Sequence, residues 1–162
     1  MMDYTNFFPL EENRWPTVEK LYRSDCVQVP EAPGVYFVCA PQKNEVIFQD
    51  RFWKRPKDLN RSVPYPPVRL EKKFAAQNCP CLLYIGKASG KKGLRQRLRQ
   101  YILCGYGKAG NHLGGRAIWQ IVNCQTLLVA WAVCPDPEGE EHALLEEFRH
   151  CQGDYPLANW RS

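Results

Sequence analysis

Short continuous apolar runs alternate along the chain with stretches whose apolar residues recur every three to four positions. Continuous runs of this length are typical of buried strands, whereas the three-to-four spacing is typical of helices packed on one face. Strands are therefore predicted at 35–39, 46–49, 82–86 and 126–133. The first two of these are expected to pair with each other.

The periodic stretches predict helices on either side of these strands. They are expected at 16–23, 68–77, 116–122 and 137–150, and after the Gly/Lys-rich turn near residue 90. Asp136 suits the N-cap of the last helix and Gly153 suits its end. The predicted fold class is α/β: one small sandwich in which a few-stranded mixed sheet is flanked by helices.

The 162 residues are expected to form a single domain with two elaborations. Residues 1–32 precede the first strand as an N-terminal extension, and the proline-rich segment 41–80 forms a long excursion between two strands. The longest apolar run has eight residues, far fewer than the roughly 20 that a transmembrane helix needs. We therefore expect no membrane partner, and because no secretory signal is visible we predict a cytoplasmic protein.

The charge of the chain is unevenly distributed. The net charge is +5, but residues 51–116 hold 16 Lys and Arg residues and only two acids. Aromatic residues are interspersed in this basic span, and such a mixture suits nucleic acid, because rings stack on bases while cations hold phosphates. A solvated basic face without a partner is the alternative interpretation.

The eight cysteines are scattered, and the one close pair is Cys79-Pro80-Cys81. That spacing is shorter than the two-to-four-residue gap of a structural zinc site. We therefore expect mostly buried, reduced thiols, with zinc binding as the alternative.

One residue of the 137–150 helix breaks its amphipathic pattern. Leu144, Leu145 and Phe148 form the apolar stripe, and Glu141 lies three, four and seven positions before them on the same face. An inward carboxylate is costly unless it is paired, hydrogen-bonded or bound to a metal. Glu141 is therefore a candidate metal ligand, unless it lies above the core in solvent.

Two further segments supply a pair of motifs. Gly34-Val35-Tyr36 and Tyr84-Ile85-Gly86 resemble the two half-motifs of the GIY-YIG nuclease family. Their surroundings are especially similar to the N-terminal nuclease domain of the bacterial excision-repair incision enzyme. The resemblance extends from about residue 33 to 160 and implies the fold described above.

The resemblance also implies a set of site residues. Arg97 and Tyr101 match an arginine and a tyrosine one helical turn apart, Glu141 matches the family glutamate, and Asn159 matches a C-terminal asparagine. The implied activity is metal-dependent hydrolysis of DNA phosphodiester bonds, with Mg²⁺, replaceable by Mn²⁺, held by Glu141 alone.

The same resemblance assigns roles around the phosphate. Arg97 would hold the scissile phosphate, and Tyr36, Tyr84 and Tyr101 would surround the phosphate and the attacking water. Tyr36 is the candidate general base, which requires nearby cations such as Lys87 or the metal to lower its pKa. The remaining residues expected to bind substrate are Gly86, Lys87, Lys108, His112, Arg116 and Asn159.

The chain departs from the family pattern in two ways. Tyr36 and Tyr84 are 48 positions apart, so residues 41–80 are an insertion between the half-motifs. The distance from Glu141 to Asn159 is also longer than in the repair domain, and Glu147 reproduces the shorter distance. The apolar register favours Glu141.

Three functions therefore stay open. The leading interpretation is a restriction-like or structure-selective DNA endonuclease that uses the basic insertion to read its target, as a homodimer or by sequential nicking if it cuts both strands. The second is an inactive nucleic-acid-binding module of the same fold, and the third is a zinc-stabilised interaction domain.

Overall fold

The computed structural model describes residues 15–41, 46–57, 63–77, 82–109 and 114–161. Four helices and three strands occur in these segments, in the order α2 (Val18–Arg23), β1 (Gly34–Cys39), α3 (Pro67–Ala76), β2 (Leu82–Ala88), α4 (Gly93–Gly105), β3 (Leu128–Val133) and α5 (Pro137–Gln152). Two 3₁₀ segments, Arg116–Gln120 and Cys124–Thr126, precede β3. The predicted small α/β domain is confirmed.

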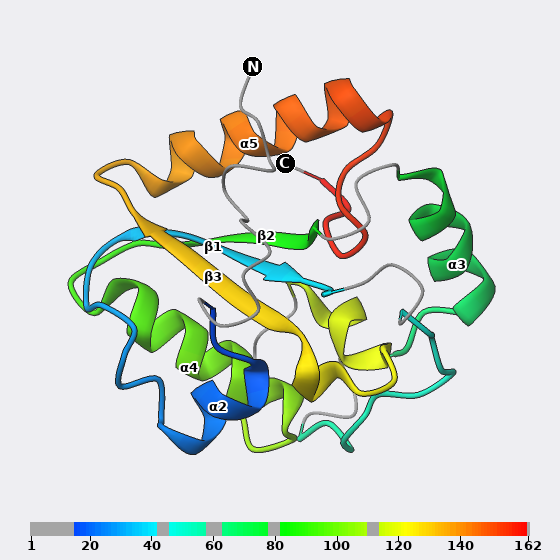
Figure 1. Cartoon of the computed structure of the whole chain (residues 1–162), viewed down its shortest axis with the longest axis horizontal. Coiled ribbons are helices and arrows are strands. Elements are labelled where there is room, and N and C mark those ends of the chain that lie inside the picture. The colour runs from blue at the N-terminus through cyan, green and yellow to red at the C-terminus, as the bar shows by residue number, and fades with distance from the viewer. Residues whose placement is uncertain (1–14, 42–45, 58–62, 78–81, 110–113, 162) are drawn as a thin grey trace.

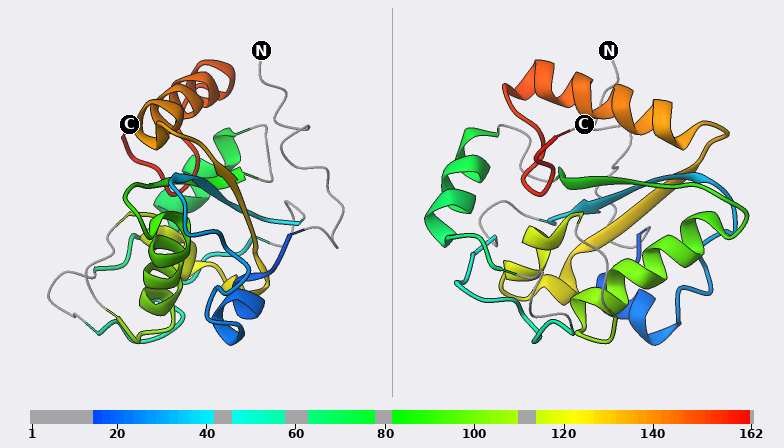
Figure 2. Two further views of the ribbon diagram at one scale, coloured as in Figure 1. Left: turned by 90° about the vertical axis from the view of Figure 1, so that its left-hand side faces the viewer. Right: turned by 180° about the vertical axis from the view of Figure 1, so that it is seen from behind.

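The sheet has the strand order β2-β1-β3. Both pairings are antiparallel, so among the described strands the sheet is antiparallel and not mixed as predicted. Figure 1 shows α5 on one side of this sheet and α4 with α2 on the other. The two further views in Figure 2 show the same three layers.

The central strand β1 is buried over its whole length because both sheet faces are covered. Its side chains alternate between two cores, as strand geometry requires. Val35 and Phe37 pack with Leu144 and Phe148 of α5. Tyr36 and its neighbours on the other face pack in the larger core that contains α4.

The helix boundaries follow the expected signals. The Asp136 side chain accepts a hydrogen bond from the Gly139 backbone N–H at 3.1 Å, which caps α5. Gly153 ends the helix in the left-handed region at φ +85°. The predicted 116–122 helix is shorter, since the chain becomes extended at Ile121.

The predicted pairing of 46–49 with the first strand is wrong. Both edges of β1 are already occupied by β2 and β3, so no edge is left for it. This segment lies instead beside the 3₁₀ region, where Phe48 forms an isolated bridge with Ile121. The Val122 N–H donates to the Ile47 carbonyl at 2.8 Å.

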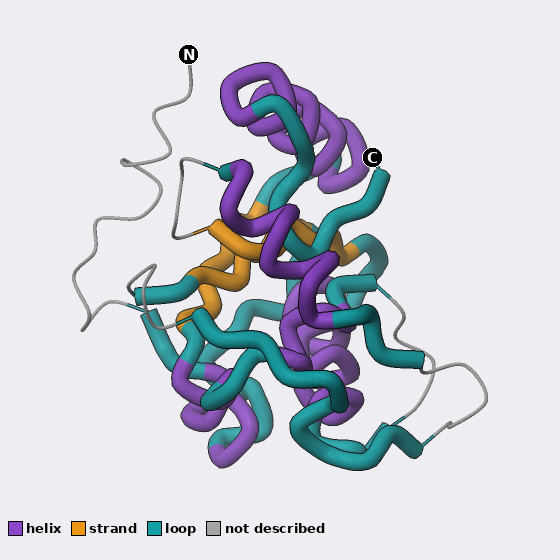
Figure 3. The backbone as a smooth tube through the Cα atoms, turned by 90° about the vertical axis from the view of Figure 1, so that its right-hand side faces the viewer, coloured by secondary structure: helices purple, strands orange, loops and turns teal. Residues whose placement is uncertain are grey.

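A buried amide attaches two parts of the 41–80 excursion to the domain. The Gln120 side chain donates to the carbonyls of Gln49 at 3.0 Å and Tyr65 at 2.8 Å, and accepts from the Tyr65 N–H at 2.8 Å. Viewed from the side on which α3 lies, this helix crosses in front of the strands (Figure 3). The described part of the excursion is thus packed against the domain.

Candidate active site at the edge of the sheet

Three tyrosines from three elements meet beneath the sheet. Tyr36 of β1, Tyr84 of β2 and Tyr101 of α4 have ring centroids 5.6–6.0 Å apart. All three are buried, and the Tyr101 hydroxyl donates to the Gly115 carbonyl at 2.9 Å. We call Tyr36, Tyr84 and Tyr101 the tyrosine cluster.

Glycines make room for this cluster. Gly86 pairs with Tyr36 across the two strands, and a Cβ at position 86 would overlap the Tyr36 ring. Gly115, at φ +70°, lies against Tyr84 and Tyr101 in the same way. Gly86, predicted to bind substrate, therefore has a packing role that explains the glycine of the second half-motif.

The protonation of the cluster differs from the expectation for a general base. Burial raises the pKa of Tyr36, and the charge of Arg97, together with the Tyr84 hydroxyl, only partly opposes this effect. Burial also raises the pKa values of Tyr84 and Tyr101 well above the usual value. Lys87, named as one cation that could lower the pKa of Tyr36, extends instead toward carboxylates of α5, and Arg97 is the cation whose charge acts on Tyr36.

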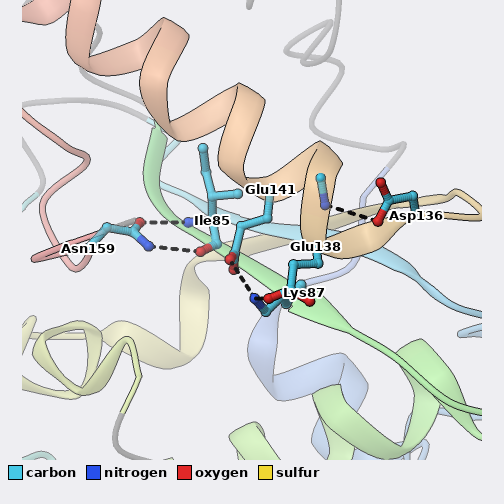
Figure 4. A network of polar contacts seen from close by, with 7 residues as sticks. Ile85, Lys87, Asp136, Glu138, Glu141 and Asn159 are labelled. Atoms are coloured by element: carbon cyan, nitrogen blue, oxygen red, sulfur yellow. Dashed lines mark hydrogen bonds and ion pairs between the residues drawn. The ribbon is translucent and has the colours of Figure 1, made fainter.

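Glu141 lies at the border of the buried face of α5, above the edge of β2. Its carboxylate is 3.4 Å from Lys87 Nζ, which also lies 3.3 Å from Glu138 (Figure 4). The Glu141 side chain is 16% exposed against 81% for Glu138, so the two carboxylates differ mainly in solvation. Burial raises the pKa of Glu141, and Lys87 compensates only in part.

A cavity of about 280 Å³ opens at this edge of the sheet. Tyr84 and Glu141 line it together, so it joins the tyrosine cluster to the one carboxylate among its described lining residues. Glu147, the alternative family glutamate, is not among those residues. The other lining residues are Tyr65, Gly114, Gly115, Arg116, Leu145, Ala158, Asn159, Trp160 and Arg161.

The C-terminal segment closes part of the β2 edge. The Ala158 N–H donates to the Leu83 carbonyl at 2.9 Å. The Asn159 amide accepts from the Ile85 N–H and donates to the Ile85 carbonyl, both at 2.9 Å (Figure 4). Asn159, predicted to bind substrate, thus acts as a side-chain extension of the sheet that positions the cavity wall.

The predicted cations are placed differently from one another. Arg97 of α4 is half-buried, and its charge acts on Tyr36, Tyr84 and Glu141, although Arg97 is not among the residues that line the cavity. Arg116 lines the cavity. Lys108 is exposed in the turn after α4 and is not a lining residue.

The predicted histidine and the cysteines, which were candidate phosphate or zinc ligands, are not among the described residues that line the cavity. His112, Cys79 and Cys81 lie outside the described residues. Six cysteines are free thiols in the described segments: Cys26, Cys39, Cys104, Cys124, Cys134 and Cys151. Within those segments no group of three or more His, Cys, Asp and Glu side chains is placed to hold a metal ion.

Seven lining residues were not predicted as site residues: Tyr65, Gly114, Gly115, Leu145, Ala158, Trp160 and Arg161. The glycine pair before Arg116 and the aromatic residue after Asn159 were available signals, but their significance depends on contacts between distant segments. No helix in the described part of the chain is long and apolar enough to cross a membrane. Comparison with protein-family models, curated proteins and solved structures gave no match.

Proposed function

We propose that this protein is a divalent-metal-dependent DNA endonuclease of the GIY-YIG type. The observation that carries the proposal is the convergence of Tyr84 and Glu141 on one cavity, where the charge of Arg97 acts on both groups. A nuclease of this kind needs a carboxylate, a fixed guanidinium and hydroxyl groups around one phosphate. These groups come from β2, α4 and α5.

The surroundings of Glu141 suit a hard cation. Its carboxylate is largely desolvated and borders a cavity, and among the described residues it forms an ion pair with the ammonium group of Lys87, which it shares with Glu138. Mg²⁺ commonly binds through one or two carboxylates and keeps several waters, so a single glutamate is an adequate protein ligand. When bound, such an ion supplies Lewis acidity toward a phosphate oxygen and an activated water.

The chain's own groups would act around the phosphate. Arg97 would stabilise the charge that develops on the phosphoryl oxygens through its planar donors. Because the tyrosine pKa values are raised, the three phenols in the structure as it stands are neutral hydroxyls, suited to donating hydrogen bonds. Tyr36 becomes a proton acceptor only if positive charge at the occupied site offsets its burial.

The exposed cations support DNA as the substrate. In the excursion and α3, Arg51, Lys54, Arg55, Lys57, Arg69 and Lys72 are exposed and suited to phosphates. Lys73 is an exception to the predicted basic surface. It is 9% exposed, and its ammonium donates to the carbonyls of Pro156, at 3.0 Å, and Asn159.

The inactive binding module is the second candidate, and one observation favours it. Lys87 already provides a counter-charge for Glu141, which lowers the gain from binding a cation there. Both candidates predict DNA binding, and only the first predicts cleavage. A restriction-like or structure-selective role, a cytoplasmic location and homodimer formation remain proposals that accompany the first candidate.

The test is cleavage of plasmid DNA with Mg²⁺, Mn²⁺ or EDTA. Glu141→Gln should abolish cleavage and preserve DNA binding, because it removes one ligand without changing the basic surface. Glu147→Gln is the matched control on the same helix and should retain activity. Cleavage lost only in the Glu147 variant would show that the wrong glutamate was chosen, and wild-type binding without any cleavage would favour the inactive module.

A further inference from the structure

A second group of rings borders the cavity, and here the rings alternate with arginines. The Tyr65 and Trp160 centroids are 4.9 Å apart. Arg116 lies over Tyr65 at 4.7 Å, and Arg69 lies over Trp160 at 4.5 Å and over Tyr65 at 5.5 Å. We call Tyr65, Arg69, Arg116 and Trp160 the stacked cluster.

Segments far apart in the sequence hold this cluster in place. Gln120 hydrogen-bonds both backbone groups of Tyr65. Lys73, one turn after Arg69 on α3, binds the carbonyl of Asn159 and lies 4.0 Å from the Trp160 ring centroid. The rings are therefore positioned before any ligand binds.

Stacking orients an arginine without using its hydrogen-bond donors. A guanidinium group meets a ring through its flat face, while its N–H donors lie in its plane and extend to the side. Those edges match the geometry of phosphate oxygens. Arg69 is exposed, and Trp160 is 36% exposed, so both are accessible from solvent.

The composition of the cavity wall limits the kinds of ligand that can bind there. Arg116 and Arg161 line it beside Tyr65 and Trp160, and Glu141 is the one acid among the described lining residues. Cations next to accessible rings suit a ligand that has both anionic and planar aromatic groups. A nucleotide unit of a DNA strand has this combination.

We propose that the stacked cluster is a subsite for an unpaired stretch of DNA beside the bond to be cut. Arg69 and Arg116 bind a backbone phosphate, and Trp160 stacks on a neighbouring base. The stretch is unpaired because bases within a duplex are already stacked on both faces. This inference rests on the proposed function, since the same cavity contains Glu141, and it makes the enzyme selective for DNA structure.

The test measures binding in EDTA, where cleavage is suppressed, with a labelled 12-nucleotide oligo(dT) and a duplex of equal length. Trp160→Leu keeps apolar bulk but removes the ring, and should weaken single-strand binding by roughly 5- to 100-fold. Arg69→Ala should reduce the salt dependence by about 0.7 in log–log slope. Lys72→Ala removes another exposed cation of α3, one that belongs to the general basic surface and not to the cluster. It is the comparison, and it should weaken oligo(dT) and duplex binding alike, by less than Arg69→Ala weakens oligo(dT) binding.

The outcomes are distinguishable. Equal losses for oligo(dT) and duplex, or an effect of Lys72→Ala as large as that of Arg69→Ala, would overturn the subsite in favour of a general basic surface. If Trp160→Leu proves unstable, Arg69→Ala still tests the subsite, because the Arg69 side chain is exposed and its removal should not affect folding. Cluster-dependent binding without cleavage would contradict only the nuclease, whereas Glu141-dependent cleavage with binding unaffected by both cluster variants would contradict only the subsite.

Discussion

Two aromatic clusters border the same cavity, and they differ in what surrounds their rings. The tyrosine cluster is packed between the sheet and α4, where burial raises the pKa of each phenol. The stacked cluster lies where the excursion meets the C-terminal segment, and its rings contact arginines. The aromatic residues of the tyrosine cluster thus offer neutral hydroxyl groups, whereas those of the stacked cluster hold arginine side chains over their rings.

The largest effect expected is on the rate of cleavage, through Arg97 beside the tyrosine cluster. Arg97→Ala should lower the single-turnover rate by about 10²–10³, the usual value of one preorganised donor. Arg97→Lys should restore only part of this rate, because an ammonium group lacks the planar fork. Arg99→Ala is the control, because Arg99 lies on the same helix as Arg97 and its substitution breaks an exposed pair with Asp25. Wild-type turnover by Arg97→Ala would remove this residue from the mechanism.

Gln120→Leu should disrupt the stacked cluster and leave the tyrosine cluster intact. The substitution leaves the partly buried backbone groups of Gln49 and Tyr65 without their hydrogen bonds, and we expect a loss of about 2–4 kcal/mol in unfolding free energy. Chemical denaturation measures the loss. Oligo(dT) binding should weaken in the same variant. Unchanged binding by the folded variant would show that the Gln120 hydrogen bonds are not needed to position the stacked cluster.

Gly86→Ala should have the opposite effect: it should disturb the tyrosine cluster and leave the stacked cluster intact. Its Cβ would overlap the Tyr36 ring, and overpacking of this kind costs typically about 1–3 kcal/mol. Ser89→Ala, at an exposed position just after β2, is a control that should change stability little. Cleavage should fall more than oligo(dT) binding in Gly86→Ala, and a reversed order would contradict the assignment of the two clusters.

The smallest effect concerns pH and the lysine beneath Trp160. Burial lowers the pKa of Lys73 to about 8, against opposition from Asp154. Between that value and about 10.5 the unfolded chain holds this proton more tightly than the folded chain, so the contribution of Lys73 to stability rises with pH in this window. We expect about 1 kcal/mol, because the two carbonyl acceptors of Lys73 favour the charged form.

The comparison for this pH effect is Lys73→Met, followed by denaturation at pH 7.5 and pH 10. Buried thiols and phenols with raised pKa values lose stability over this range in both proteins. The expected result is therefore a difference: between the two pH values the wild-type protein should gain about 1 kcal/mol relative to the variant. Parallel behaviour of the two proteins would show that Lys73 keeps its ordinary pKa.

The sequence predicted much of the fold because its strongest signals are local. The apolar run at 82–86 and the capping residues Asp136 and Gly153 act through neighbours in the chain, and the structure places them as expected. The pairing of 46–49 could not be predicted in this way, since it depended on which strands occupied the edges of β1.

The same distinction applies to the candidate site. Sequence alone determined that Glu141 follows the apolar register of its helix and that Tyr36 and Tyr84 lie on buried strands, because periodicity decides which face a residue occupies. Only the tertiary structure decided that Lys87 pairs with Glu141, that Asn159 binds the edge of β2, and that Trp160 meets Arg69. These contacts join residues 54 to 91 positions apart, and no local pattern records a distance that the packing of the whole chain sets.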